Sequence, residues 1–247
     1  MNAAAGEKKA IVSYWGKRSE DFAKLRQEEL RSNKSERWKR EILPRIPEDR
    51  EHTKILDIGT GAGFFSIMLA QNGYRHVTGI DLTPEMIEQA RMLSRNMETS
   101  PSFCVMDAEK LNFPSESFDV IITRNLTWTL PHPDLAYREW FRVLKKGGVL
   151  LNFDADYGME EEKEEEIPEN HAHNRIDKAL LREHDRIKAQ LPCTCLKRPG
   201  VDVEFLKAAG FSEVLTDFRL SDRIYREKDE FYNPVPMFLI YAVRGRV

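Results

Sequence analysis

The chain has 247 residues, 41% of them hydrophobic, which is enough apolar material for one sizeable domain. Its formal net charge of −3 argues against a general polyanion-binding surface. No apolar run approaches membrane-spanning length and the amino-terminal MNAAAGEKKA lacks a signal-peptide core, so we expect a cytoplasmic protein without a membrane span. The three cysteines, Cys104, Cys193 and Cys195, are too few and too poorly spaced for a disulfide framework or a four-ligand zinc site, and we expect no metal.

The amino-terminal region is predicted to be helical. Its first ten residues look like a loose start, whereas residues 11–43 are charged, helix-prone and carry several aromatic side chains. Pro44 and Pro47 end this region. We therefore predict a helical segment over residues 1–43 that precedes a main domain over residues 44–247.

The most informative stretch is Lys54 to Gly73, KILDIGTGAGFFSIMLAQNG. Residues 55–58 are apolar and β-branched enough for a short buried strand, GTGAG forms a turn, and residues 64–71 have helical spacing. A strand, a glycine turn and a helix bring the backbone against a nucleotide-like ligand in a doubly wound α/β sheet. The glycine pattern is G-x-G-x-G, whereas a dinucleotide fingerprint would require glycine at Phe64.

Strands and helices continue to alternate after this turn. The next strand ends in Asp81, and Thr83 and Pro84 begin the helix that follows. An acid at this place can accept hydrogen bonds from both hydroxyls of a ribose. The final two strands are expected to form an antiparallel pair. The expected strands are 55–58, 76–81, 102–106, 118–123, 149–153, 211–218 and 237–244, and two later helices are expected over 133–144 and 199–210.

Residues 154–199 are predicted to be an insertion. They contain the acidic run Glu160 to Glu166, which we interpret as a solvated face or a mobile lid segment, and a charged helix over residues 172–190. The short pairs His171 with His173 and Cys193 with Cys195 lack the further ligands of a metal site.

Several motifs together resemble the class I S-adenosylmethionine (SAM) dependent methyltransferases. The acid-preceded glycine turn resembles their first motif, and the opening at Tyr14–Phe22 resembles the Y-W-x-x-R-A-x-x-Y start of many small-molecule enzymes. The sequence R-V-L-K-x-G-G-x-L at residues 142–150 resembles the menaquinone and ubiquinone biosynthesis branch in particular. The resemblance implies an α/β fold with a doubly wound, Rossmann-like, seven-stranded sheet. That sheet would be mainly parallel with an antiparallel last strand, with amino-terminal helices and a helical insertion after the fifth strand.

The resemblance also implies a SAM site at the carboxyl ends of the strands. Asp81 would bind the ribose, Asp107 the adenine amino group, and the backbone near Arg124 the amino group of the methionine moiety. Tyr14 and Arg18 would close over the cofactor. The expected members of the site are Tyr14, Arg18, Asp57, Gly59, Thr60, Gly61, Gly63, Asp81, Leu82, Met86, Asp107, Ala108, Arg124 and Asn125.

The acceptor is expected beyond the fourth and fifth strands. A sulfonium leaves as a neutral thioether, so the protein mainly aligns a nucleophile with the methyl group and excludes water. The candidates for a base or for positioning the acceptor are His132, Asp154, Asp156 and Tyr157, and those for binding it are Tyr14, Trp128, Asp154 and Tyr157. For each of these residues, an ordinary loop cap or a core aromatic is the alternative interpretation.

The expected function is methyl transfer from SAM to a small-molecule acceptor, by in-line displacement, in a monomer or a homodimer. Three alternatives stay open: a SAM-binding protein without transferase activity, a nicotinamide-dependent oxidoreductase, and an RNA methyltransferase. Phe64 disfavours the oxidoreductase. Nucleic-acid substrates are disfavoured because residues 124–127, RNLT, depart from the N/D-P-P-Y/F segment of nucleic-acid amino-methyltransferases.

Overall fold

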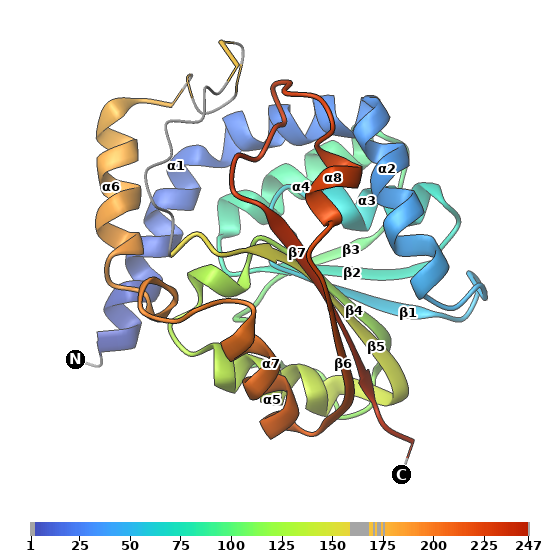
Figure 1. The fold of residues 1–247 in the computed structure, drawn as a ribbon. Coiled ribbons are helices and arrows are strands. Elements are labelled where there is room, and N and C mark those ends of the chain that lie inside the picture. The colour runs from blue at the N-terminus through green and yellow to red at the C-terminus, as the bar shows by residue number, and fades with distance from the viewer. Residues whose placement is uncertain (1–2, 159–167, 170, 172–173, 175, 247) are drawn as a thin grey trace.

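The computed structural model describes residues 3–158, 168–169, 171, 174 and 176–246 (Figure 1). The strands are β1 (Lys54–Ile58), β2 (His76–Asp81), β3 (Ser102–Val105), β4 (Phe118–Arg124), β5 (Leu144–Ala155), β6 (Phe211–Asp217) and β7 (Met237–Arg244). The α-helices are α1 (Ala3–Arg31), α2 (Asn33–Ile42), α3 (Phe64–Gln71), α4 (Pro84–Asn96), α5 (Pro133–Val143), α6 (Lys178–Lys188), α7 (Gly200–Ala209) and α8 (Leu220–Ile224). The short 3-10 helices are η1 (Leu43–Arg45), η2 (Thr127–Thr129) and η4 (Pro192–Thr194).

The seven strands form one sheet in the order β3-β2-β1-β4-β5-β7-β6. Strands β1 to β5 pair in parallel, and β7 runs antiparallel to both of its neighbours, β5 and β6. The predicted fold class is therefore confirmed. Because β1 lies between β2 and β4, the strand order reverses at β1, and ligands of doubly wound sheets bind at the carboxyl ends of such strands.

The sheet separates two apolar cores. Alternate residues of β1 face opposite sides, so Ile55 packs in the core with Trp38 and Phe65, and Leu56 packs in the core with Trp140. Figure 1 shows α2, α3, α4 and α8 on one face of the sheet and α5 and α7 on the other. Helix α6 lies beside α1.

Some boundaries differ from the expectation. The loose start is wrong, because α1 already begins at Ala3. Strand β5 begins at Leu144 rather than at residue 149, since Leu144 pairs with Phe118 before a bulge. Helix α6 is shorter than the expected 172–190 and begins after Asp177, whose side chain caps the N–H of Ala179. The acidic run 160–166 lies outside the described residues.

The turn between β1 and α3 ends at Gly63, which has the left-handed φ of +88°. A Cβ at this position would lie 3.0 Å from the ring of Phe103 and 3.2 Å from the Cβ of Ala90. The position therefore demands glycine for its backbone and for close packing.

Replacing Gly63 by alanine is expected to lower the free energy of unfolding by about 1–2 kcal/mol, because an L-residue is strained in this conformation. The measurement is urea unfolding followed by circular dichroism. Gly200→Ala is the matched control, since a Cβ there meets nothing within 4 Å. Equal unfolding midpoints for both variants would show that the turn tolerates a side chain.

Candidate active site

A cavity of about 600 Å³ opens at the carboxyl ends of the central strands, against α1 and α6. Among the expected cofactor residues, Gly63 does not line it and faces Phe103 instead. The expected residues that do line it are Tyr14, Arg18, Asp57, Gly59, Thr60, Gly61, Asp81, Leu82, Met86, Asp107, Ala108, Arg124 and Asn125. Residues dispersed over more than a hundred positions of sequence thus meet in one cavity.

The glycine turn lies in the wall of this cavity. Gly59 and Gly61 both have positive φ, and a Cβ on Gly59 would lie only 2.8 Å from the side chain of Leu126. Below the turn, the buried carboxylate of Asp57 accepts hydrogen bonds from Thr60 Oγ1 (2.6 Å) and from Ser66 N (3.0 Å). Burial raises the pKa of Asp57. The turn is therefore held rigidly and leaves its backbone open to a close ligand.

Asp81 marks the end of β2 beside the same turn. One of its oxygens accepts the N–H of Gly61 (3.0 Å) and the other accepts the N–H of Thr83 (2.9 Å). Burial raises the pKa of Asp81. The carboxylate is thus fixed at the cavity wall, and each oxygen keeps a further lone pair with which it can accept a ligand hydroxyl.

Asp107 is tied to α1 across the cavity. Nζ of Lys8 lies 2.6 Å from Asp107 Oδ2 and 2.5 Å from Glu109 Oε2. The other oxygen of Asp107 accepts the N–H of Glu109 (2.9 Å). The first turns of α1 are therefore fastened to the loop after β3, which the sequence did not indicate.

The side chain of Arg124 takes part in a buried charge cluster. Its guanidinium makes two hydrogen bonds to Glu29, at 2.9 and 3.1 Å, and Arg26 approaches the same carboxylate at 2.6 Å. Trp38 Nε1 also donates to Glu29 (3.1 Å). Burial lowers the pKa of Arg26 to about 10, and the neighbouring charge of Arg124 adds to this effect. Two guanidinium groups thus share one carboxylate at the cavity wall.

Aromatic rings from separate elements form a second wall. The ring of Trp128, in η2, lies 5.2 Å from the ring of Tyr157, which follows β5. The hydroxyl of Tyr157 accepts a hydrogen bond from Asn233 Nδ2 (2.8 Å) and donates one to Asn125 Oδ1 (3.1 Å), and burial raises its pKa. Trp128 and Tyr157 therefore present fixed rings to the cavity.

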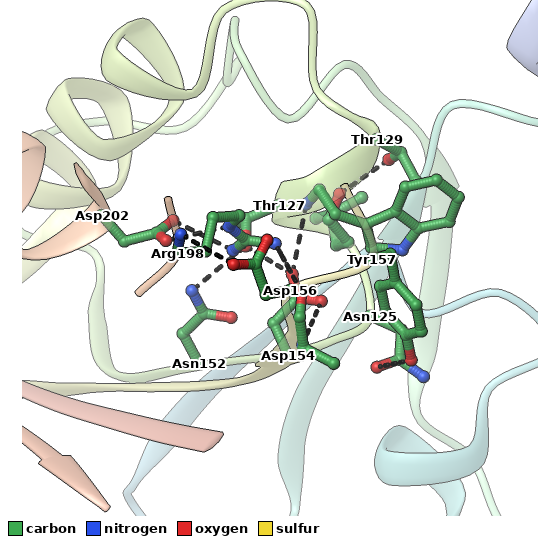
Figure 2. A network of polar contacts seen from close by, with 12 residues as sticks. Asn125, Thr127, Thr129, Asn152, Asp154, Asp156, Tyr157, Arg198 and Asp202 are labelled. Atoms are coloured by element: carbon green, nitrogen blue, oxygen red, sulfur yellow. Dashed lines mark hydrogen bonds and ion pairs between the residues drawn. The ribbon is translucent and has the colours of Figure 1, made fainter. Parts of the chain in front are cut away.

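A buried polar network supports this wall from behind (Figure 2). Arg198 Nε donates to Asp202 (2.9 Å), its Nη1 lies 3.2 Å from Asp154 Oδ2, and its Nη2 donates to Thr127 Oγ1. Asp154 also accepts the N–H of Trp128 (3.2 Å). The network ties the loop after β4, the end of β5 and the start of α7 to one another.

Three of the expected acceptor-side residues do not line the cavity. Asp154 is fully buried on Arg198, so its expected role as a base gives way to that of a structural counter-ion. Asp156 accepts the backbone N–H of Arg198 (3.2 Å). His132 is exposed at the start of α5. Of the four candidates for a base, Tyr157 lines the cavity.

Several lining or supporting residues escaped the sequence analysis. Lys8, Arg26, Glu29, His184 and Arg198 belong to this set. A usable signal existed in α1, where the cavity-lining residues recur every three or four positions, as one helix face requires. These positions are Lys8, Ile11, Tyr14, Trp15, Arg18, Phe22, Leu25 and Arg26. The other residues act through contacts distant in sequence.

Within the described part of the chain, no group of three or more histidine, cysteine or acidic residues is placed to hold a metal ion. No helix among the described residues is both long enough and apolar enough for a membrane span.

Residues 56–152 match the family model of a methyltransferase domain. This segment runs from β1 to β5 and contains the glycine turn, Asp81 and Asp107. The resemblance to class I methyltransferases that the motifs indicated is thereby confirmed for this segment.

Two curated relatives show where the similarity extends. The 2-methyl-6-phytyl-1,4-hydroquinone methyltransferase of Synechocystis is 32% identical over 129 residues, which cover 52% of this chain and 39% of the relative. The phosphatidylethanolamine N-methyltransferase of Cereibacter sphaeroides is 37% identical over 113 residues, which cover 42% of this chain and 53% of the relative. The chain thus spans about half of these relatives' length or less.

A solved structure shows the same fold. Phosphoethanolamine N-methyltransferase 2 of Haemonchus contortus, in complex with phosphomonomethylethanolamine and S-adenosylhomocysteine, superposes with a TM-score of 0.58 at 19% identity. The superposition covers 84% of this chain and 52% of that one.

Proposed function

We propose that this chain is a SAM-dependent methyltransferase that acts on a small-molecule acceptor. The observation that carries the proposal is the meeting of the glycine turn, Asp57 and Asp81 in one cavity. Gly59, Thr60 and Gly61 line this cavity, so the backbone of the turn can be approached closely by a ligand there, and the residues fit the cofactor. When bound, SAM supplies an activated methyl group on a sulfonium.

The residues of this chain would divide the task of holding the cofactor. Asp81 would accept the ribose hydroxyls, and Asp107 would accept the adenine amino group. The backbone at Arg124 would meet the methionine amino group. Helix α1 lies against the cavity through Tyr14 and Arg18 and would exclude water from it. Positioning of this kind supplies up to about 7–11 kcal/mol in ideal intramolecular reactions.

The acceptor would bind against the aromatic wall of Trp128 and Tyr157. Aromatic faces stabilise planar rings and cations alike, by about 0.5–2 kcal/mol for a cation. The two curated relatives act, by their names, on a hydroquinone and on an ethanolamine lipid, so both classes are reasonable first probes. We infer that the protein works as a monomer or a homodimer.

Incubation with radiolabelled SAM tests the proposal. A small-molecule extract and an RNA preparation are offered in parallel, and labelled product is expected in the small-molecule fraction. Label in the RNA would support an RNA methyltransferase instead. Binding of SAM without any labelled product would indicate a SAM-binding protein that is not a transferase.

A further inference from the structure

Helix α6 brings a histidine into the cavity that the proposed cofactor residues line. The ring of His184 lies 5.5 Å from the ring of Tyr14 on α1 and 5.5 Å from that of Trp128. Next to it, Lys17 and Glu183 form a salt bridge at 2.8 Å that joins α1 to α6. The imidazole thus lies between Tyr14 of α1 and Trp128 of the aromatic wall.

The two ring nitrogens of His184 have different surroundings. Nδ1 lies 3.5 Å from Asp185 Oδ1, which favours the tautomer with its proton on Nδ1 and leaves a lone pair on Nε2. Among the residues that the structure describes, no hydrogen bond engages Nε2. The side chain is 25% exposed and lines the cavity.

Burial favours the neutral form of this imidazole. Burial lowers the pKa of His184 below its ordinary value of about 6.5, and the positive charges of Lys188 and Arg18 act in the same direction. Asp185 opposes them. Tyr14 and Trp128, which pack against the ring, carry no charge at neutral pH. The group is therefore ready to receive a proton near pH 7.

Two of the residues expected to act as a base are already engaged. The hydroxyl of Tyr157 is bonded to Asn125 and Asn233, and burial raises its pKa. Asp154 is buried on Arg198. Neither group offers the free lone pair that Nε2 of His184 has.

We propose that His184 is the general base of the methyl transfer and that the acceptor is a nucleophile with an ionisable proton, a hydroxyl or an amine. The proposal rests on the proposed function. As the acceptor's lone pair bonds to the methyl carbon, the S–CH₃ bond breaks with its electron pair passing to sulfur, and the acceptor's proton passes to Nε2. The positive charge lost by the sulfonium is gained by the imidazolium, so the step balances without another reagent.

The test compares His184→Gln and His184→Ala with the wild-type protein. The probes are phosphoethanolamine, 2-methyl-1,4-hydroquinone and any acceptor found in the small-molecule extract. Both variants are expected to transfer methyl groups about 10²–10⁴-fold more slowly, the usual contribution of a general base. Their affinity for SAM, measured by calorimetry, should stay within about threefold of wild type, on the order of RT in free energy. His52→Gln is the matched control, because His52 pairs with Asp49 at 3.0 Å on the exposed surface.

Two further measurements separate a base from a structural residue. The wild-type rate should rise with pH through the pKa of His184, below about 6.5, and level off near neutral pH. Imidazole added to His184→Ala should restore activity. Independently of activity, the His184 ring should titrate below about 6.5 by NMR in protein saturated with S-adenosylhomocysteine.

The experiments distinguish a failure of the role of His184 from a failure of the proposed function. Wild-type rates and pH profiles in both variants, or an imidazole that is still protonated at neutral pH, would overturn the role of His184 and leave the proposed function standing. If the wild-type protein binds SAM and methylates none of the probes, the proposed function fails and the role of His184 fails with it.

Discussion

Replacing Arg198 by methionine is expected to lower the free energy of unfolding by about 3–5 kcal/mol. Arg198 is 6% exposed and supplies the cation for Asp154 and Asp202, which are 0% and 2% exposed. Methionine fills much of the same volume, yet it leaves two buried carboxylates without their positive partner. Their desolvation is then uncompensated. Urea unfolding, followed by circular dichroism, measures the loss.

Two controls define the cause of this loss. Arg138→Met removes an exposed pair with Asp134, at 3.5 Å, and should cost less than about 1 kcal/mol. Adding Asp154→Asn and Asp202→Asn to Arg198→Met removes the unpaired charges and should recover part of the stability. An Arg198→Met protein that unfolds at the wild-type urea concentration would contradict this account of the network.

Replacing Asp81 by alanine is expected to weaken SAM binding by about 1–3 kcal/mol, which is roughly 5- to 150-fold in Kd. The carboxylate is fixed by the N–H groups of Gly61 and Thr83 and would accept the ribose hydroxyls. Its loss removes charged acceptors from a buried site. Calorimetric titration of the folded variant measures the change.

The matched variant is Asp119→Ala. Asp119 also accepts a backbone N–H, that of Lys54 at 2.9 Å, but it lies at the opposite end of the strands and does not line the cavity. SAM affinity should be unchanged in this variant. S-adenosylhomocysteine has the same ribose, so Asp81→Ala should weaken its binding equally. Unchanged affinity in a folded Asp81→Ala protein would refute the ribose assignment.

The sheet could be predicted from the sequence because its signals are local. Apolar runs such as 55–58 and 118–123 form buried parallel strands, and the glycine turn and Asp81 follow directly at strand ends. The carboxyl ends of parallel strands meet at one edge, so residues placed there by pattern alone come together in the cavity. This is why most of the expected cofactor residues line it.

Other features depend on contacts that no local pattern specifies. Arg198 pairs with Asp154, 44 positions earlier (198 − 154), and this pairing turns an expected base into a structural counter-ion. Glu29 of α1 forms an ion pair with Arg124 only because the fold brings α1 to the end of β4. His184 lies in the insertion, on α6, and none of the family motifs covers that part of the sequence. The positions of Arg198, Glu29 and His184 in the site therefore depend on ion pairs between distant residues and on the packing of α1 and α6, which local sequence patterns do not predict.

Calorimetric titration of the purified protein with SAM, S-adenosylhomocysteine and NADH tests the central claim most directly. If the cavity built on the glycine turn and Asp81 is a SAM site, both adenosyl ligands should bind in the micromolar range and NADH should not bind. Binding of NADH, or the failure of both adenosyl ligands to bind, would contradict it.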